Sequence, residues 1–176
     1  MTTEETIPAW VSGQLRPVGK LEVHRRGLRH KAVSVFVTDR GRLLIQRRAL
    51  GKYHTPGLWA NSCCTHPRWG EPPLACAERR LAEELGIERL PLRPVGEIEY
   101  RADVGGGLTE HEEVSLFAAE AGPDLVVAPN PEEVMDWAWI SAEELAASIS
   151  AEPARYTPWL RIYMTERRGA LFGAPV

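Results

Sequence analysis

The stretch from Glu71 to Ile87 reads EPPLACAERRLAEELGI. Its two prolines fit the first turn of a helix, where backbone N–H groups have no partner inside the helix. Gly86 fits the end of that helix, so the pattern predicts a helix over residues 71–86. At about 100° per residue, four apolar side chains fall in one narrow sector and form the predicted buried stripe: Leu74, Ala77, Leu81 and Leu85.

The same helix carries two pairs of opposite charge, each one turn apart. Arg80 and Glu84 lie together on one shoulder of the stripe, and Arg79 and Glu83 lie further from it. The helix therefore places a cation and a carboxylate beside its buried face.

Apolar runs before and after this helix predict β-strands. Residues 33–37 and 43–45 flank a turn at 39–41, which is typical of a β-hairpin. Residues 51–70 are rich in Gly and Pro and predict a loop with a short strand near Trp59. The remaining predicted elements are strands over 94–101, 113–120 and 137–140 and helices over 142–149 and 155–168.

This order of elements predicts the fold class. Alternating strands with few helices indicate a single domain of mixed α/β (α+β) class, a β-sheet sandwich flanked by helices. Residues 1 to about 12 carry no such pattern and predict a loose N-terminal arm.

The composition is that of a globular protein. The 176 residues are 44% apolar, and 21 basic against 24 acidic side chains leave a net charge of −3. A mildly acidic body does not attract nucleic acid or an anionic membrane, so we expect neither as a partner. We also expect no secretion signal and no membrane span, which needs roughly 20 apolar residues. Three cysteines, two of them adjacent, favour the reducing cytoplasm over a disulfide framework.

Histidines and carboxylates from separate segments are candidates for a metal site. His24 and His30 precede the first predicted strand, and His66 lies in the loop before the helix. Glu110 and Glu112 share one side of a strand, because side chains alternate with a period of two. A divalent ion needs imidazoles and carboxylates that converge from several segments. Taken singly, each of these residues is more often a surface side chain.

Cys64 and a group of cations are further candidates. Cys64 lies two residues before His66 and could be a nucleophile, an acid–base group, a ligand or a small buried apolar residue. The cations could form a phosphate pocket or a solvated edge. They are Lys20, Arg47, Arg48, Lys52 and Arg80.

Seven short motifs follow one another in a distinctive order: QRRALGK (46–52), GLWANSCCTHP (57–67), RRLAEELG (79–86), YRA (100–102), EHE (110–112), DWAW (136–139) and TPW (157–159). In this order they resemble the type 1 isopentenyl-diphosphate isomerases of the Nudix superfamily, from about residue 19 to 160. The most specific combination is Cys-x-His-Pro with Glu-x-Glu beginning 46 residues after the cysteine.

The Nudix hydrolases share the signature Gly-x5-Glu-x7-Arg-Glu-U-x-Glu-Glu-x-Gly-U, in which U is apolar. The chain matches it at Glu71, Arg79, Leu81, Glu83, Glu84, Gly86 and Ile87. Thr65 stands where the first Gly belongs, and Arg80 stands where a Glu belongs. Exchanging a metal-binding carboxylate for a cation should cripple the metal-assisted water attack of the hydrolases, so this position favours an isomerase.

The resemblance implies a Nudix-type fold, with an arm over residues 1–18 and one isomerase domain over 19–176. The catalytic residues that it implies are Cys64, with Glu112 and Tyr100 on the opposite side of the substrate. Phosphate contacts are implied for Lys20, Arg48, Lys52 and Arg80, and Trp159 would line the hydrocarbon end of the substrate site.

The resemblance also implies two ions. The ligands of one divalent ion (zinc, manganese or magnesium) would be His24, His30, His66, Glu110 and Glu112. A second ion, Mg²⁺, would lie between the diphosphate, Glu84 and the backbone carbonyl of Cys64.

The implied activity interconverts isopentenyl diphosphate and dimethylallyl diphosphate for isoprenoid biosynthesis. We therefore expect a small diphosphate as the partner of a cytoplasmic chain that is a monomer or a weak dimer. Two other functions fit parts of the pattern. One is a Nudix pyrophosphohydrolase acting on a nucleotide or another diphosphate, and the other is a diphosphate-binding relative without catalysis.

Overall fold

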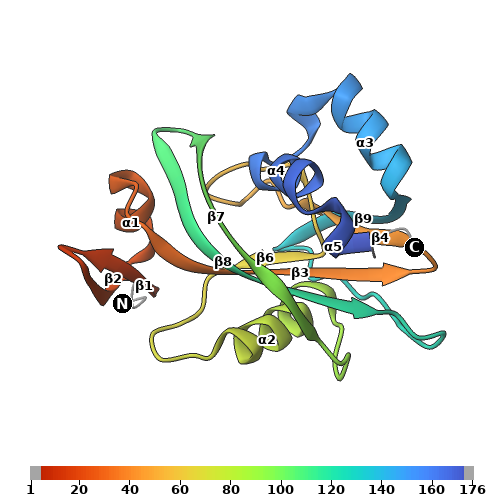
Figure 1. Cartoon of the computed structure of the whole chain (residues 1–176), viewed down its shortest axis with the longest axis horizontal. Helices are drawn as coiled ribbons and strands as arrows, with labels where there is room; N and C mark the ends of the chain where they lie inside the picture. Colours follow the sequence, from red (N-terminus) through yellow and green to blue (C-terminus); the bar gives the residue numbers. More distant parts are fainter. Residues whose placement is uncertain (1–4, 173–176) are drawn as a thin grey trace.

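The computed structural model describes residues 5–172. Strand β3 (His30–Asp39) is the central strand of its sheet (Figure 1). It runs parallel to β8 (Leu108–Glu120) along one edge and antiparallel to β6 (Cys63–Thr65) along the other. At its end a tight turn leads into β4 (Arg42–Arg48), which confirms the predicted hairpin. The central part of β3 is therefore hydrogen-bonded on both edges.

The other strands extend from β8 and β4. β7 (Arg93–Gly105) pairs antiparallel with β8, and the two are joined by a glycine turn. β4 pairs with β9 (Val134–Ser141) and with the short β5 (Trp59–Ala60). Parallel and antiparallel pairs thus combine in one mixed sheet, as predicted from the sequence.

Helices lie on both sides of this sheet. α2 (Pro73–Leu85) covers one side, and α3 (Ala142–Ala151), α4 (Pro158–Glu166) and α5 (Arg168–Phe172) lie on the other (Figure 1). Two cores result, and the valines of β3 face α2 while Ala32 and Phe36 belong to the core beneath α4. The mixed-sheet fold with flanking helices agrees with the prediction.

The predicted helix over 155–168 is divided in the structure. A short 3₁₀ turn (Pro153–Arg155) comes first, and α4 begins only at Pro158. The reason is local: the Thr157 side chain accepts a hydrogen bond from the Leu160 N–H and so caps a new helix.

The predicted buried stripe of α2 is wrong at one end. Leu74 is 41% exposed, and Cys76 is buried in its place. The helix is rotated so that its charged shoulder, including Glu84, also faces inward. This rotation leaves Leu74 at the outer margin of the stripe.

The loose arm predicted for the first 12 residues is wrong from residue 6 onward. β1 (Thr6–Val11) and β2 (Gln14–Gly19) form a hairpin that joins β3 through Ala9 opposite His30. Ile7 and Ala9 pack into a small core with Val23 of α1 (Lys20–Arg26). Residues 1–4 lie outside the described part of the chain, and the domain boundary at residue 18 stays a prediction.

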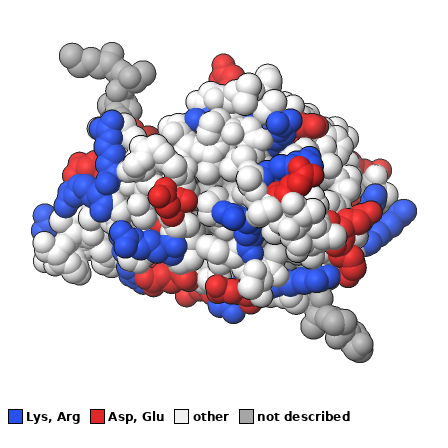
Figure 2. All heavy atoms as spheres, turned by 90° about the horizontal axis from the view of Figure 1, so that it is seen from above, with Lys and Arg blue, Asp and Glu red and all other residues white. Residues whose placement is uncertain are grey.

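Acidic and basic side chains are interspersed over the face drawn in Figure 2. Within residues 5–172, no helix is both long and apolar enough to cross a bilayer.

The rotation of α2 predicts unequal costs for two leucines of the same helix. Leu81 is 1% exposed, so Leu81→Ala should lower the free energy of unfolding by about 2–5 kcal/mol. Leu74→Ala should lower it by less than about 0.5 kcal/mol, because that side chain is already partly in water. Urea unfolding of both variants measures the difference, and equal losses would contradict this orientation of the helix.

Candidate active site

β8 carries two buried carboxylates on one face. Glu110 and Glu112 point inward, whereas His111 between them points outward and contacts Glu99. Strand alternation produces this separation, as expected from the sequence.

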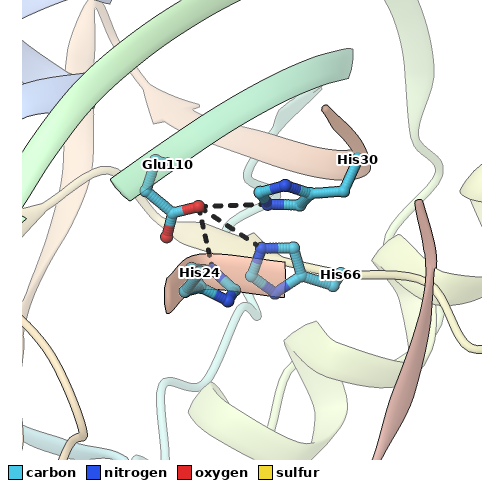
Figure 3. A group of neighbouring side chains, drawn as sticks. All are labelled: His24, His30, His66 and Glu110. Carbon is cyan, nitrogen blue, oxygen red and sulfur yellow. Dashed lines mark hydrogen bonds and ion pairs between the residues drawn. The ribbon is translucent and has the colours of Figure 1, made fainter. Parts of the chain in front are cut away.

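Three histidines from three segments surround Glu110 (Figure 3). The Nε2 atoms of His24 in α1, His30 at the start of β3 and His66 after β6 lie 3.0, 3.1 and 3.8 Å from Glu110 Oε2. All four side chains are buried. The structure thus brings together four of the five residues predicted as ligands of the first ion.

The outer nitrogens of two rings fix how they face the centre. His24 Nδ1 lies 2.6 Å from the Lys20 carbonyl, and His30 Nδ1 lies 2.7 Å from the Leu28 carbonyl. A carbonyl oxygen can only accept a hydrogen bond, so each Nδ1 carries a proton and donates it outward. The lone pair of each ring is then on Nε2, which faces the centre of the cluster. This donor set of imidazole nitrogens and a carboxylate oxygen suits a divalent transition metal.

Glu112, the fifth predicted ligand, adjoins the same cluster. Its Oε1 lies 2.9 Å from His66 Nε2, and its Oε2 accepts a 2.6 Å hydrogen bond from the Tyr100 hydroxyl. Strand register explains the positions of Tyr100 and of His30, which lies 3.7 Å away: Tyr100 lies opposite Glu112 across β7 and β8, and His30 lies opposite it across β3 and β8. Glu112 therefore joins the His/Glu cluster to a phenol.

The charges of the cluster depend on one another. Burial alone would raise the pKa of Glu110, but contacts with four histidines outweigh it and hold the pKa well below its usual range. Burial alone would lower the pKa of His30, yet contacts with Glu110 and Glu112 raise it to about 10. At neutral pH and without an ion, His30 therefore carries a proton that balances the carboxylates.

Cys64 comes from the other side of the site. β6 places it opposite Ser34 of β3, and the Ser34 hydroxyl lies 3.0 Å from Cys64 Sγ and 2.8 Å from the Tyr163 hydroxyl. Burial raises the pKa of the Cys64 thiol well above its usual value. Its neighbour Cys63 belongs to the core beneath α2, so the two thiols face opposite sides of the sheet, as strand alternation predicts.

One pocket connects these groups. Its lining includes Cys64, His66, Glu84, Glu110 and Glu112. It also includes all five residues predicted for substrate binding: Lys20, Arg48, Lys52, Arg80 and Trp159. Arg47, the remaining candidate cation, instead donates to the Gly57 carbonyl.

Three of the four cations of this pocket are held by carboxylates. Lys20 lies 3.0 Å from Glu5, Lys52 contacts Glu133, and Arg80 lies 2.5 Å from Glu84. The free volume is only about 30 Å³. A bound diphosphate would therefore replace these carboxylates as the partner of the cations.

Unpartnered donors mark the same pocket. The described part of the chain has six buried side-chain nitrogen or oxygen atoms without a partner in hydrogen-bond geometry. Four of them belong to pocket residues: Arg48 Nε, His54 Nε2, Arg80 Nε and Trp159 Nε1. Of these, His54 Nε2 already has a close contact, 2.7 Å from Glu110 Oε1. Burying a donor without a partner costs about 1–3 kcal/mol, so this concentration indicates a binding site for acceptor atoms.

Glu84 is a second candidate ion ligand, from α2. Its Oε2 accepts a 2.8 Å hydrogen bond from Gln46 Nε2, and its Oε1 pairs with Arg80. It lines the same pocket as Cys64. A role for Glu84 and the Cys64 carbonyl in holding Mg²⁺ stays a prediction.

Sequence reasoning missed several residues of the site. His54 contacts Glu110, Ser34 contacts Cys64, and Tyr163 contacts Ser34. Ser34 interrupts a run of valines on a buried strand, and this polar exception was a usable signal. His54 and Tyr163 stand alone in a loop and a helix, where no spacing rule distinguishes them.

The fold and the site together define a NUDIX domain protein. A family model described as NUDIX domain matches residues 28–160. A solved structure from Deinococcus radiodurans shares the fold, with a TM-score of 0.73 at 17% identity over 92% of this chain and 98% of that one. A MutT NUDIX hydrolase from Burkholderia pseudomallei gives a TM-score of 0.61 at 21% identity over 79% of this chain and 98% of that one.

Curated relatives narrow this class. A protein of Dinoroseobacter shibae named isopentenyl-diphosphate Delta-isomerase is 62% identical over 97% of each chain. A protein of the same name from Cereibacter sphaeroides is 60% identical over 96% of each chain. The chain therefore belongs to the isopentenyl-diphosphate Delta-isomerase family of NUDIX domain proteins.

The raised pKa of His30 predicts how ion binding depends on pH. An ion can take the place of the His30 proton only if that proton leaves, so each bound ion should release about one proton at pH 7. Affinity for Mn²⁺ should therefore rise by up to about tenfold per pH unit between pH 7 and 9 and fall on acidification. Calorimetry in buffers of different ionisation enthalpy measures the released proton, and affinity independent of pH would contradict the assignment.

Proposed function

We propose that this chain interconverts isopentenyl diphosphate and dimethylallyl diphosphate by protonation and deprotonation. The observation that carries the proposal is the pocket that Cys64 and Glu112 both line, with Tyr100 bonded to Glu112 and cations nearby. The names of the curated relatives, 60–62% identical over nearly the whole chain, support the same reaction.

The reaction requires two acid–base groups on opposite faces of the substrate. An alkene is a very weak base, so a well-placed acid must protonate its terminal carbon. A tertiary carbocation then forms, and a base on the other face removes a proton from the carbon nearer the diphosphate. The double bond moves, and no atom of the carbon–diphosphate framework is lost.

Glu112 and Tyr100 are the acid in this proposal, and Cys64 is the base once its thiol has lost its proton. Burial opposes the thiolate, whereas the Ser34 hydroxyl and the charge of Arg48 favour it. The 2.6 Å hydrogen bond between Tyr100 and Glu112 lets a proton be shared between phenol and carboxylate at the reacting face. Trp159 lines the pocket and offers an indole face, which attracts a cation by roughly 0.5–2 kcal/mol. The buried setting also keeps water from the carbocation.

Four cations bind the diphosphate in this proposal: Lys20, Arg48, Lys52 and Arg80. Mg²⁺ held by Glu84 and the Cys64 carbonyl would share that charge. Firm binding matters because an allylic diphosphate is a leaving group, and its departure would abort the reaction.

The His/Glu centre fits a divalent ion, held by His24, His30, His66, Glu110 and Glu112. When bound, the ion would make a proton on Glu112 or Tyr100 more acidic. We also place the activity in the cytoplasm, where free thiols such as the three cysteines here persist.

Arg80 favours isomerase over hydrolase chemistry. It occupies the signature position of a carboxylate, and its guanidinium lies within 2.7 Å of Glu83 and 2.5 Å of Glu84. A cation there cannot help to hold the ion that activates water in the hydrolases, whereas it suits a diphosphate that must stay intact.

The test of the proposed function is incubation with isopentenyl diphosphate and Mg²⁺ in heavy water. Deuterium should appear in dimethylallyl diphosphate with the native chain, as measured by mass spectrometry. Cys64→Ala should lose this exchange with its fold intact, because the proposed base is gone. Cys63→Ala is the matched control and should keep nearly full activity, since that thiol faces the other core.

Two outcomes would contradict the proposal. Release of phosphate without deuterium exchange would indicate a hydrolase instead. Substantial turnover by Cys64→Ala would show that the reaction does not need this thiol.

Arg80 and Arg79 provide a second matched pair. Their side chains are 18% and 19% exposed, and each is ion-paired, but only Arg80 lines the pocket. Arg80→Gln should raise KM for isopentenyl diphosphate about 10- to 100-fold, because a charge-assisted hydrogen bond contributes about 1.5–3 kcal/mol. Arg79→Gln should leave KM unchanged in steady-state assays. Equal KM values for the two variants would remove Arg80 from the diphosphate site.

A further inference from the structure

A fourth histidine touches the His/Glu centre from a different direction. His54 lies in the loop between β4 and β5, and its Nε2 is 2.7 Å from Glu110 Oε1. Its side chain is only 3% exposed. Within residues 5–172, Nε2 has no partner in good hydrogen-bond geometry, so this close contact is its main polar neighbour.

The contact with Glu110 decides which tautomer of His54 fits. Glu110 is a carboxylate that only accepts, so Nε2, which lies 2.7 Å from it, carries the proton. Nδ1 then accepts from the Thr55 hydroxyl, 2.9 Å away. The ring is also packed edge-on against Trp159, at 5.8 Å between ring centres, which restricts its movement.

The two oxygens of Glu110 consequently have different neighbours. Oε2 faces the Nε2 atoms of His24 and His30, whereas Oε1 faces His54. We infer that His54 is a positioning residue: it holds Oε1 and leaves Glu110 to bind the ion of the His/Glu centre through Oε2 alone. This inference rests on the proposed function only in assuming that the centre holds an ion.

The position of His54 in its loop connects the two halves of the site. The same loop carries Lys52 into the pocket, and the His54 carbonyl accepts a 3.1 Å hydrogen bond from Arg48 Nη2. One short segment thus presents the Lys52 cation toward the pocket and a donor toward the ion centre. A substitution of His54 should therefore affect ion binding first and substrate binding second.

Two substitutions separate donation from packing. His54→Phe keeps a ring against Trp159 but removes the donor, and should weaken binding of Mn²⁺ alone by about 10- to 100-fold. His54→Gln keeps an N–H group at similar reach and should stay within about threefold of the native affinity. Equilibrium dialysis with electron paramagnetic resonance measures both, and thermal unfolding checks that each variant is folded.

His111→Phe is the matched control, because His111 lies between the two carboxylates on β8 but points outward. Its Mn²⁺ affinity should equal that of the native chain. Electron spin-echo spectra of the Mn²⁺ form should show three coupled imidazoles in the native chain and in His54→Gln.

Two results would overturn the inference. Native affinity in His54→Phe would mean that Glu110 needs no such donor. Four coupled imidazoles in the native chain and three in His54→Gln would make His54 a ligand. Because Mn²⁺ binding is measured without substrate, failure of the deuterium assay alone would overturn the proposed function and leave this inference standing.

Discussion

The parallel register between β3 and β8 is the constraint on which the site depends. It places His30 opposite Glu112, and the β7–β8 hairpin then places Tyr100 opposite the same residue. A slip of one residue would turn Glu110 and Glu112 toward solvent and bring His111 inward. The alternation along β8 opposes such a slip, because Val114 and Leu116 would leave the core beneath α4. The packing that stabilises the fold therefore also holds the proposed acid–base geometry.

Burial of charge is tolerated here because nearly every buried charge has a partner. Glu110 is surrounded by histidines, and Glu84 accepts from Gln46 and Arg80. A buried carboxylate without such partners would cost several kcal/mol or take up a proton. The donors without partners are instead concentrated on the pocket, where an acceptor-rich ligand would satisfy them. The buried donors that cost the fold most free energy therefore lie in the pocket, where a diphosphate could accept hydrogen bonds from them.

Much of the local structure could be predicted from the sequence. Spacing in β8 correctly put Glu110 and Glu112 on one face, and the pattern from Glu71 to Ile87 correctly indicated a helix. The errors arose where tertiary packing overrides a local pattern. α2 rotates to bring Glu84 inward and exposes Leu74, and the N-terminal residues gain a strand by pairing with β3.

The sequence by itself determined the elements, the alternation of side chains and, through its motifs, the family. Those properties follow from the helical and strand periods and from residue identity, which are local. Only the tertiary structure decided that His54 meets Glu110, that Ser34 meets Cys64 and that Tyr163 meets Ser34. Such contacts join residues far apart in the chain, and single residues in loops and helices carry no period that reveals their partners. Their distances are set by strand register and helix rotation, which packing of the whole chain determines.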